Sequence, residues 1–264
     1  MVSSPLNCKS NLHSRSNSLP SRLHPLFPQI DEHLTRLISS SEASPSSSSL
    51  ISKNLSNLRD VYEMVDALLQ LPHAEQALAQ KCQDDEVLNG SLRLLDACGM
   101  AKDALLQAKT STPELQSTLG RRGDEVEFVQ DVKEYLAPRK KTKKSINKFL
   151  RDLKSKCGLT HLENDTEAIV RMLRESNSMT SKLFHTKRVA CDEEALQSNE
   201  FAKVDAALCT FIIQTRKADN ISAKKAQNEL QKLESSIEDL EDEVERLTRQ
   251  LIKMRVYILN ILSH

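Results

Sequence analysis

A heptad run at the C-terminal end of the chain constrains the fold more than any other feature. Its large apolar residues are separated by steps of three and four without a slip, and Ala223 and Ala226 extend the register toward the N-terminus. Such spacing places these side chains along one seam of a long helix, and that seam must pack against another helix. The seam comprises Leu230, Leu233, Ile237, Leu240, Val244, Leu247, Leu251, Met254, Ile258 and Ile261. We therefore expect a coiled-coil-like helix over residues 220–262.

The sequence leaves the partner of this heptad seam open. In a parallel homodimer, Glu229 at a g position would face Glu234 at an e position, and no g–e pair would join opposite charges. Gln250 and Arg255 would give only a polar pair. From Leu251 onward, further apolar residues widen the surface beyond a two-helix seam. This pattern favours burial inside the chain's own bundle and a monomer, with oligomerisation through the heptads as the alternative.

The scarcity of glycine indicates the fold class. The 264 residues include only 5 glycines and no tryptophan, whereas sandwiches, barrels and nucleotide-binding α/β folds need many glycine-rich turns. No strand-like alternation and no repeat at a fixed interval is present. The 37 basic and 37 acidic residues cancel, so net charge indicates no polyanionic partner. We expect an all-α protein, with a single elongated helical-bundle domain over residues 29–264.

The first part of the chain is predicted to be irregular. Residues 1–28 contain no acid, seven serines and four of the eight prolines, which is typical of a flexible, disordered basic arm. Apolar residues at helical spacing follow over residues 30–38 and 50–71. The Ser-rich segment 39–49 between them is predicted to be a loop, and Pro72 marks the end of the second helix.

Glycine and proline predict the later helix boundaries. Gly99 is expected to interrupt one helix, and Thr112 with Pro113 to begin another as N-cap and first-turn proline. Pro138 is expected to separate a preceding helix from a basic helix over residues 138–157. Further helices are predicted near residues 161–187, 192–217 and 220–262.

Cysteine usage and hydropathy bear on the location of the protein. The six cysteines lie far apart without a C-x-x-C pair, and no secretory hydrophobic segment follows Met1, so we expect free thiols and no secretion. The longest apolar runs, 206–214 and 256–262, are about half of the roughly 18 residues that a membrane helix needs. The expected location is the cytoplasm, with the nucleus or a peripheral membrane site as alternatives. The Ser-rich start resembles a transit peptide but lacks an amphipathic helix, so a chloroplast location is not expected.

No motif predicts catalysis, a cofactor or a metal site. The seven histidines form no H-E-x-x-H pattern, and Cys157 and His161 are separated by the helix breaker Gly158. There is no G-x-S-x-G elbow and no phosphate-binding glycine loop. We therefore expect a protein that is not an enzyme and has no cofactor and no catalytic or metal-binding residues. An enzyme whose acid–base pair is assembled only by the fold is the weakest alternative.

The predicted helix over residues 138–157 is basic and amphipathic. It carries nine positive charges against Asp152 alone, above an apolar stripe that includes Ile146. Such a helix can lie on anionic lipid, bind a protein groove or contain a nuclear import signal, or its charges can be a solvated face above a core stripe. Nucleic acid is not expected, because no aromatic residues alternate with the charges to stack bases. The candidate docking residues are Arg139, Lys140, Lys141, Lys143, Lys144 and Lys148.

The N-terminal arm contains an R-S-x-S-x-P string, formed by Arg15, Ser16, Ser18 and Pro20. A phosphate on Ser18 would add about −1.5 to −2 charges, which the arginine cluster of a 14-3-3-type reader can bind. Pro20 would turn the chain out of the reader's groove. An unmodified flexible tail is the alternative.

Several ordered strings resemble the plant-specific Bypass-like family. They are H-S-R-S-N-S-L-P-S-R-L-H-P at 13–25, L-L-Q-L-P at 68–72, G-S-L-R-L-L-D-A-C-G at 90–99, A-L-L-Q at 104–107 and R-K-K-T-K-K at 139–144. The resemblance covers nearly the whole chain. It implies a mostly helical, soluble plant protein linked to root and shoot development, with no established enzymatic activity and no catalytic residues to carry over.

The sequence thus favours a helical interaction or regulatory protein in plant development. Its regulated surfaces would be the phosphorylatable arm and the basic helix, and its partners would be proteins. The alternative is a peripheral membrane adaptor that docks on anionic lipid through residues 138–157.

Overall fold

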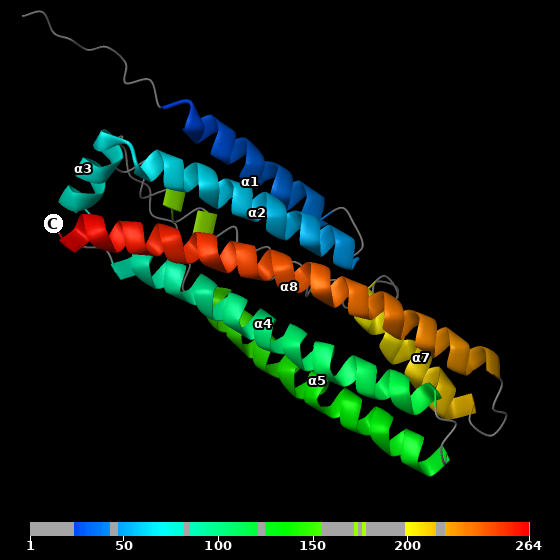
Figure 1. Ribbon diagram of the computed structural model, residues 1–264. Helices are drawn as coiled ribbons and strands as arrows, with labels where there is room; N and C mark the ends of the chain where they lie inside the picture. Colours follow the sequence, from blue (N-terminus) through cyan, green and yellow to red (C-terminus); the bar gives the residue numbers. More distant parts are fainter. Residues whose placement is uncertain are drawn as a thin grey trace, which may run out of the picture.

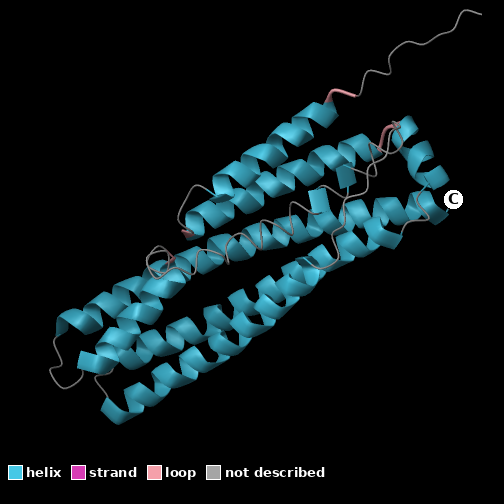
Figure 2. Ribbon diagram, turned by 180° about the vertical axis from the view of Figure 1, so that it is seen from behind, coloured by secondary structure: helices cyan, strands magenta, loops and turns pink. Residues whose placement is uncertain are grey.

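The computed structural model describes residues 24–42, 47–81, 85–120, 125–154, 172–173, 176–177, 199–214 and 220–263. This part of the chain is helical and contains no strand, which confirms the all-α prediction (Figure 2). The helices form an elongated bundle (Figure 1). They are α1 (Leu26–Glu42), α2 (Ser48–Leu69), α3 (Pro72–Lys81), α4 (Asp85–Gly120), α5 (Glu125–Lys154), α7 (Glu200–Gln214) and α8 (Asn220–Ser263).

The long helix α8 lies at the centre of the bundle. It runs between the α1–α2 pair and the α4–α5 pair, and it also contacts α3 and α7 (Figure 1). Because its apolar residues recur every three or four positions, the same side of α8 meets its neighbours at each turn. Every seam residue from Leu230 to Ile258 is buried, and Ile261 is half-buried against the same core. The predicted long C-terminal helix is therefore confirmed, with an end one residue later at Ser263.

Ion pairs accompany this apolar seam on the side of α8 that faces α4. The ammonium of Lys102 lies 2.6 Å from Oε2 of Glu245, and that of Lys109 lies 2.5 Å from Oε2 of Glu241. Lys109 follows Lys102 on α4, whereas its partner Glu241 precedes Glu245 on α8. The two helices are therefore antiparallel. These exposed pairs add little stability individually, but they fix the register of α4 on α8.

Three expected helix boundaries are wrong. Gly99 and Pro113 lie inside α4, so Thr112 is not an N-cap, and Pro138 lies inside α5. A proline inside a helix lacks one N–H and disturbs the preceding turn. Before Pro113 the hydroxyls of that turn donate to backbone carbonyls, as Thr112 Oγ1 does to the Ala108 oxygen at 2.7 Å. Packing of α4 against α8 and α5 outweighs the local preference for a break.

The Ser-rich segment 39–49 is less irregular than expected. Helix α1 continues through Glu42 and α2 already begins at Ser48, so both ends of the predicted loop are helical. Serine is compatible with a helix when its hydroxyl bonds to the preceding turn. Ser39 Oγ does so, since it donates to the Thr35 carbonyl oxygen at 3.0 Å.

Other predicted segments lie partly outside the described residues. Of the basic arm 1–28, only residues 24–28 are described, and α1 begins at Leu26 with Phe27 buried, so the end of the predicted disordered arm is wrong. Of the helix predicted near 161–187, only residues 172–173 and 176–177 are described, and these are helical. The helix predicted over 192–217 corresponds to α7, and the basic helix is described as the C-terminal part of α5 up to Lys154. The described helices share one hydrophobic core.

Candidate functional site

Four lysines of the predicted basic helix form an exposed surface on α5. Helix α5 lies at the edge of the bundle, where it contacts α4 and, more sparsely, α7 (Figure 1). We call these residues the basic surface: they are Lys140, Lys141, Lys144 and Lys148, and all are exposed. Within the described ranges, none of them forms an ion pair with an acidic side chain.

Arg139 is not part of this basic surface. Its guanidinium forms an ion pair with Asp205 on α7, and Nη1 donates to the Tyr135 hydroxyl at 3.0 Å. The guanidinium carbon also lies 5.2 Å from the centre of the Tyr135 ring and 5.0 Å from that of Phe201. Only 18% of the Arg139 side chain is exposed. Arg139 therefore connects α5 to α7, and Lys143, the remaining candidate, has a side chain outside the described part.

The environment of Tyr135 shows how tightly this junction is packed. Burial raises the pKa of the Tyr135 phenol, although the positive charge of Arg139 opposes the change. Because the phenol stays protonated, its O–H remains a hydrogen-bond donor while its oxygen accepts from Arg139. The junction is a structural contact between helices.

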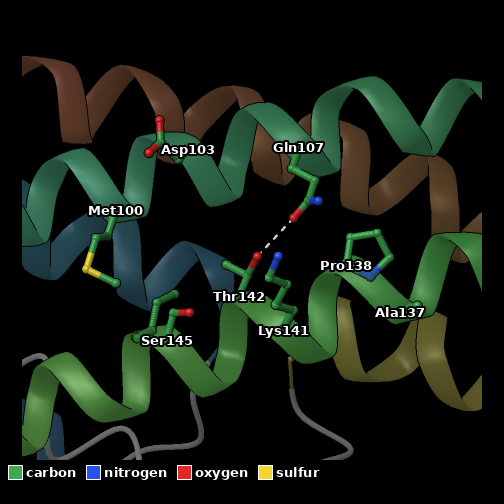
Figure 3. A pocket seen from close by; sticks show the side chains of 9 residues that line it. Met100, Asp103, Gln107, Ala137, Pro138, Lys141, Thr142 and Ser145 are labelled. Atoms are coloured by element: carbon green, nitrogen blue, oxygen red, sulfur yellow. Dashed lines mark hydrogen bonds between the residues drawn. The ribbon is translucent and has the colours of Figure 1, made fainter.

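A groove of about 630 Å³ opens between α4 and α5 beside the basic surface (Figure 3). Across its centre, Thr142 Oγ1 donates a hydrogen bond of 3.0 Å to Gln107 Oε1. Figure 3 shows the Lys141 side chain extending between the two helices toward Gln107, whereas the carboxylate of Asp103 points away from α5. The groove thus has a polar centre with an ammonium group. Its apolar lining residues are Met100, Ala137, Pro138 and Ile146.

Sequence reasoning missed the polar centre of this groove. Gln107 lies in one helix and Thr142 in another, and only the α4–α5 pairing brings them together. For Thr142, however, the helical spacing of the sequence indicates an inward-facing side chain. Tyr135, Arg139, Thr142 and Ile146 recur at steps of three and four, which predicts that Thr142 faces inward although lysines surround it in the sequence.

The N-terminal phosphorylation motif lies outside the described residues. Arg15, Ser16, Ser18 and Pro20 therefore stay a sequence-based prediction. The heptad seam, by contrast, lies in the core of the single chain, where α2, α4 and α7 contact α8.

The described residues contain two cysteines, Cys98 and Cys209. The buried Cys98 and the exposed Cys209 are both free thiols. Burial raises the pKa of the Cys98 thiol, although a hydrogen bond with Thr248 opposes the change. No group of three histidine, cysteine or acidic residues there could hold a metal ion. None of the helices in that part combines the length and the apolar character needed to cross a bilayer.

One comparison with known proteins identifies the family of the chain. A family model described as Protein BPS1 matches residues 54–186 and 176–261, which together cover most of the sequence. The curated proteins and the solved structures gave no match. The matched segments begin in α2 and extend almost to the end of α8, so they include the groove, the basic surface and the heptad seam. The chain therefore belongs to the BPS1 family, the plant-specific Bypass-like family that its sequence strings resemble.

Proposed function

We propose that this chain is a regulatory interaction protein of plant development, which is not an enzyme and which binds acidic protein partners through the basic surface of α5. Membership of the BPS1 family indicates a plant developmental regulator and specifies no biochemical activity. The finer role that we propose is in root and shoot development. We also propose that the protein acts in the cytoplasm as a monomer, because its heptad seam is buried inside its own bundle.

The observation that carries this proposal is the close spacing of four exposed lysines along one helix, Lys140, Lys141, Lys144 and Lys148 on α5. Several lysines that face α8 or lie on it have carboxylate partners: Lys102 pairs with Glu245, Lys109 with Glu241 and Lys253 with Asp66. These contacts raise the pKa of Lys109, chiefly through its hydrogen bond with Glu241. The lysines of the basic surface have no such partner among the described residues. Four adjacent unpaired cations create a positive potential that attracts acidic partners and accelerates their association.

The position of α5 makes this surface accessible. Among the described helices, α5 contacts α4 and, more sparsely, α7, whereas α8 is enclosed by several helices (Figure 1). An edge helix on a long rigid bundle can contact a partner without rearrangement of the core. The bundle therefore acts as a scaffold that presents the basic surface.

Zero-length cross-linking in plant root extract tests the proposal. A carbodiimide joins an ammonium group to a carboxylate only when the two are in contact, so it reports the expected ion pairs directly. We expect cross-links from Lys140, Lys144 and Lys148 to acidic residues of another protein. The matched control lysines Lys53, Lys224 and Lys225, which are exposed on α2 and α8, should give none. Equal cross-linking of both groups would overturn the proposal.

Docking on a membrane is the second candidate function, because exposed lysines also attract anionic lipid at about 1 kcal/mol each. The exposed large apolar residues of the described chain lie on α4 and α8, so contact of α5 with lipid would be electrostatic. Binding to phosphatidylserine vesicles would then disappear at high salt. Sedimentation with vesicles measures it: salt-sensitive binding that is lost in Lys140→Glu/Lys144→Glu would support this candidate, and no binding would exclude it.

A further inference from the structure

We infer that the groove between α4 and α5 binds one helix of the acidic partner, and that this helix carries a carboxylate between two apolar side chains. The inference rests on the proposed function, because it assigns the groove to the same partner that the basic surface attracts. It adds a specificity element, since a positive surface alone does not distinguish one acidic protein from another.

The groove has apolar ends and a charged centre. Ala137 and Pro138 lie at one end of the groove and Met100 lies at the other (Figure 3); Ile146, eight positions after Pro138 on α5, also lines it. Lys141 occupies the middle, with its ammonium group between the two helices (Figure 3). A partner segment of matching chemistry has an acidic residue flanked by apolar residues on both sides.

The length of the groove matches about two turns of a partner helix. Pro138 and Ile146 are separated by eight positions on α5, which corresponds to about 12 Å along a helix axis. A helix that lies along the groove has the same rise per residue as α5. Its side chains at positions i and about i+7 therefore reach the two apolar ends, and a residue at i+3 or i+4 meets Lys141.

Two donors at the centre can bind the carboxylate of that residue. The first donor is the Lys141 ammonium. The Asp103 carboxylate also lines the groove, but it points away from α5 and so does not neutralise this ammonium (Figure 3). The second donor is the amide nitrogen of Gln107, because Thr142 already donates to the amide oxygen of that side chain at 3.0 Å. Charge-assisted hydrogen bonds from two donors give both affinity and register. Lys144 and Lys148 lie outside the groove and add long-range attraction.

Selection from a displayed library of random peptides tests this inference on the full chain. With peptides of about four helical turns, we expect enrichment of Asp or Glu with Leu, Ile or Met three or four positions away on both sides. On Lys141→Glu the preference for the acid should disappear while the apolar preference persists. A selected peptide should bind Met100→Lys at least about tenfold more weakly than the wild type in fluorescence anisotropy.

Matched variants separate loss of the groove from loss of folding. Leu106→Lys places the same charge on an exposed apolar position of α4 that does not line the groove, and it should bind like the wild type. Because Met100 is half-buried, Ala137→Trp provides a second block at an exposed position of the groove, with Ala206→Trp on α7 as its control. Circular dichroism confirms that each variant is folded.

The outcomes distinguish this inference from the proposed function. Selected peptides without the expected pattern, or equal binding to wild type, Met100→Lys and Ala137→Trp, would overturn the groove inference. If carbodiimide cross-links from Lys144 and Lys148 to an acidic protein persisted in that case, the proposed function would stand. Binding to phosphatidylserine vesicles with no peptide enrichment would also overturn the inference.

Discussion

Oδ2 of Asp66 on α2 lies 2.8 Å from the ammonium group of Lys253 on α8. Only 6% of the Asp66 side chain is exposed, whereas Lys253 reaches it from the surface with 65% exposure. The hydrogen bond with Asp66 raises the pKa of Lys253. Together with the Lys102–Glu245 pair toward α4, this contact holds α8 on both sides within one chain. The polar flanks of the heptad helix are thus occupied by its own bundle.

Truncation of the heptad seam should therefore destabilise the monomer. Ile237 is 1% exposed, so Ile237→Ala should lower the free energy of unfolding by about 2–5 kcal/mol in urea denaturation. The control Ile252→Ala makes the same change on the same helix at a side chain that is 48% exposed, and it should change stability by about 0.5 kcal/mol or less. Light scattering should give the mass of one chain for both. A dimer that Ile237→Ala converts into a folded monomer would contradict this account.

Arg139 should contribute to stability and not to partner binding. Arg139→Ala removes the ion pair with Asp205 and the contacts with the Tyr135 and Phe201 rings. We expect a loss of about 1–3 kcal/mol in the free energy of unfolding. Lys140→Ala, at the exposed neighbouring position, should leave stability unchanged. Equal stability of the two variants would show that the junction between α5 and α7 is not formed.

Acid should weaken the contact between α2 and α7. The backbone nitrogen of Ser48 donates a hydrogen bond of 2.8 Å to the carboxylate of Glu200. The Ser48 hydroxyl donates a second hydrogen bond to the same carboxylate. Burial alone would raise the pKa of Glu200, but these bonds and the charge of Lys203 hold it below its usual range. Because the pKa of Glu200 is lower in the folded state than in the unfolded chain, the ionised carboxylate stabilises the fold above the unfolded pKa of about 4.3. This stabilisation is lost as the pH falls through the pKa of the folded state.

Glu200→Gln tests this pH dependence. The variant should be less stable than the wild type at neutral pH, and the difference should shrink below about pH 4.3 as the wild-type carboxylate becomes protonated. Urea midpoints measured across the acid range give this difference, with Glu114→Gln at an exposed position of α4 as control. A stability difference that does not change with pH would contradict the assignment.

Local patterns predicted the fold well where one helix determines the outcome. The spacing from Leu230 to Ile261 fixes a helix and its buried side, because each turn repeats the same apolar contact. Boundaries at Pro113 and Pro138 were predicted wrongly, since local rules do not include the packing of α4 and α5 along their lengths.

The candidate site was predicted less completely, because it depends on contacts between distant segments. Arg139 and Asp205 are 66 positions apart, so the sequence counted Arg139 among the surface cations. Gln107 and Thr142 are 35 positions apart and meet only in the groove. Lys140, Lys144 and Lys148 were predicted correctly as exposed, since their mutual spacing of four places them on one helix face.

Phosphorylation of Ser18 should create a binding site for 14-3-3-type proteins. A phosphate beside Arg15 supplies the charge that their arginine cluster binds. A pull-down with chain phosphorylated at Ser18 should retain the reader, and Ser18→Ala or Arg15→Ala should abolish retention. Ser14→Ala, in the same arm, is the control. Retention that is independent of phosphate would refute this role of the arm.

Rescue of plants that lack this protein tests the central claim most directly. The variant Lys140→Glu/Lys144→Glu/Lys148→Glu reverses the basic surface, and Lys53→Glu/Lys224→Glu/Lys225→Glu makes the same charge change at exposed positions on α2 and α8. Circular dichroism should show that both proteins are folded. We expect the control to restore root and shoot growth and the α5 variant to fail. Full rescue by the α5 variant would contradict the claim that this protein acts through its basic surface.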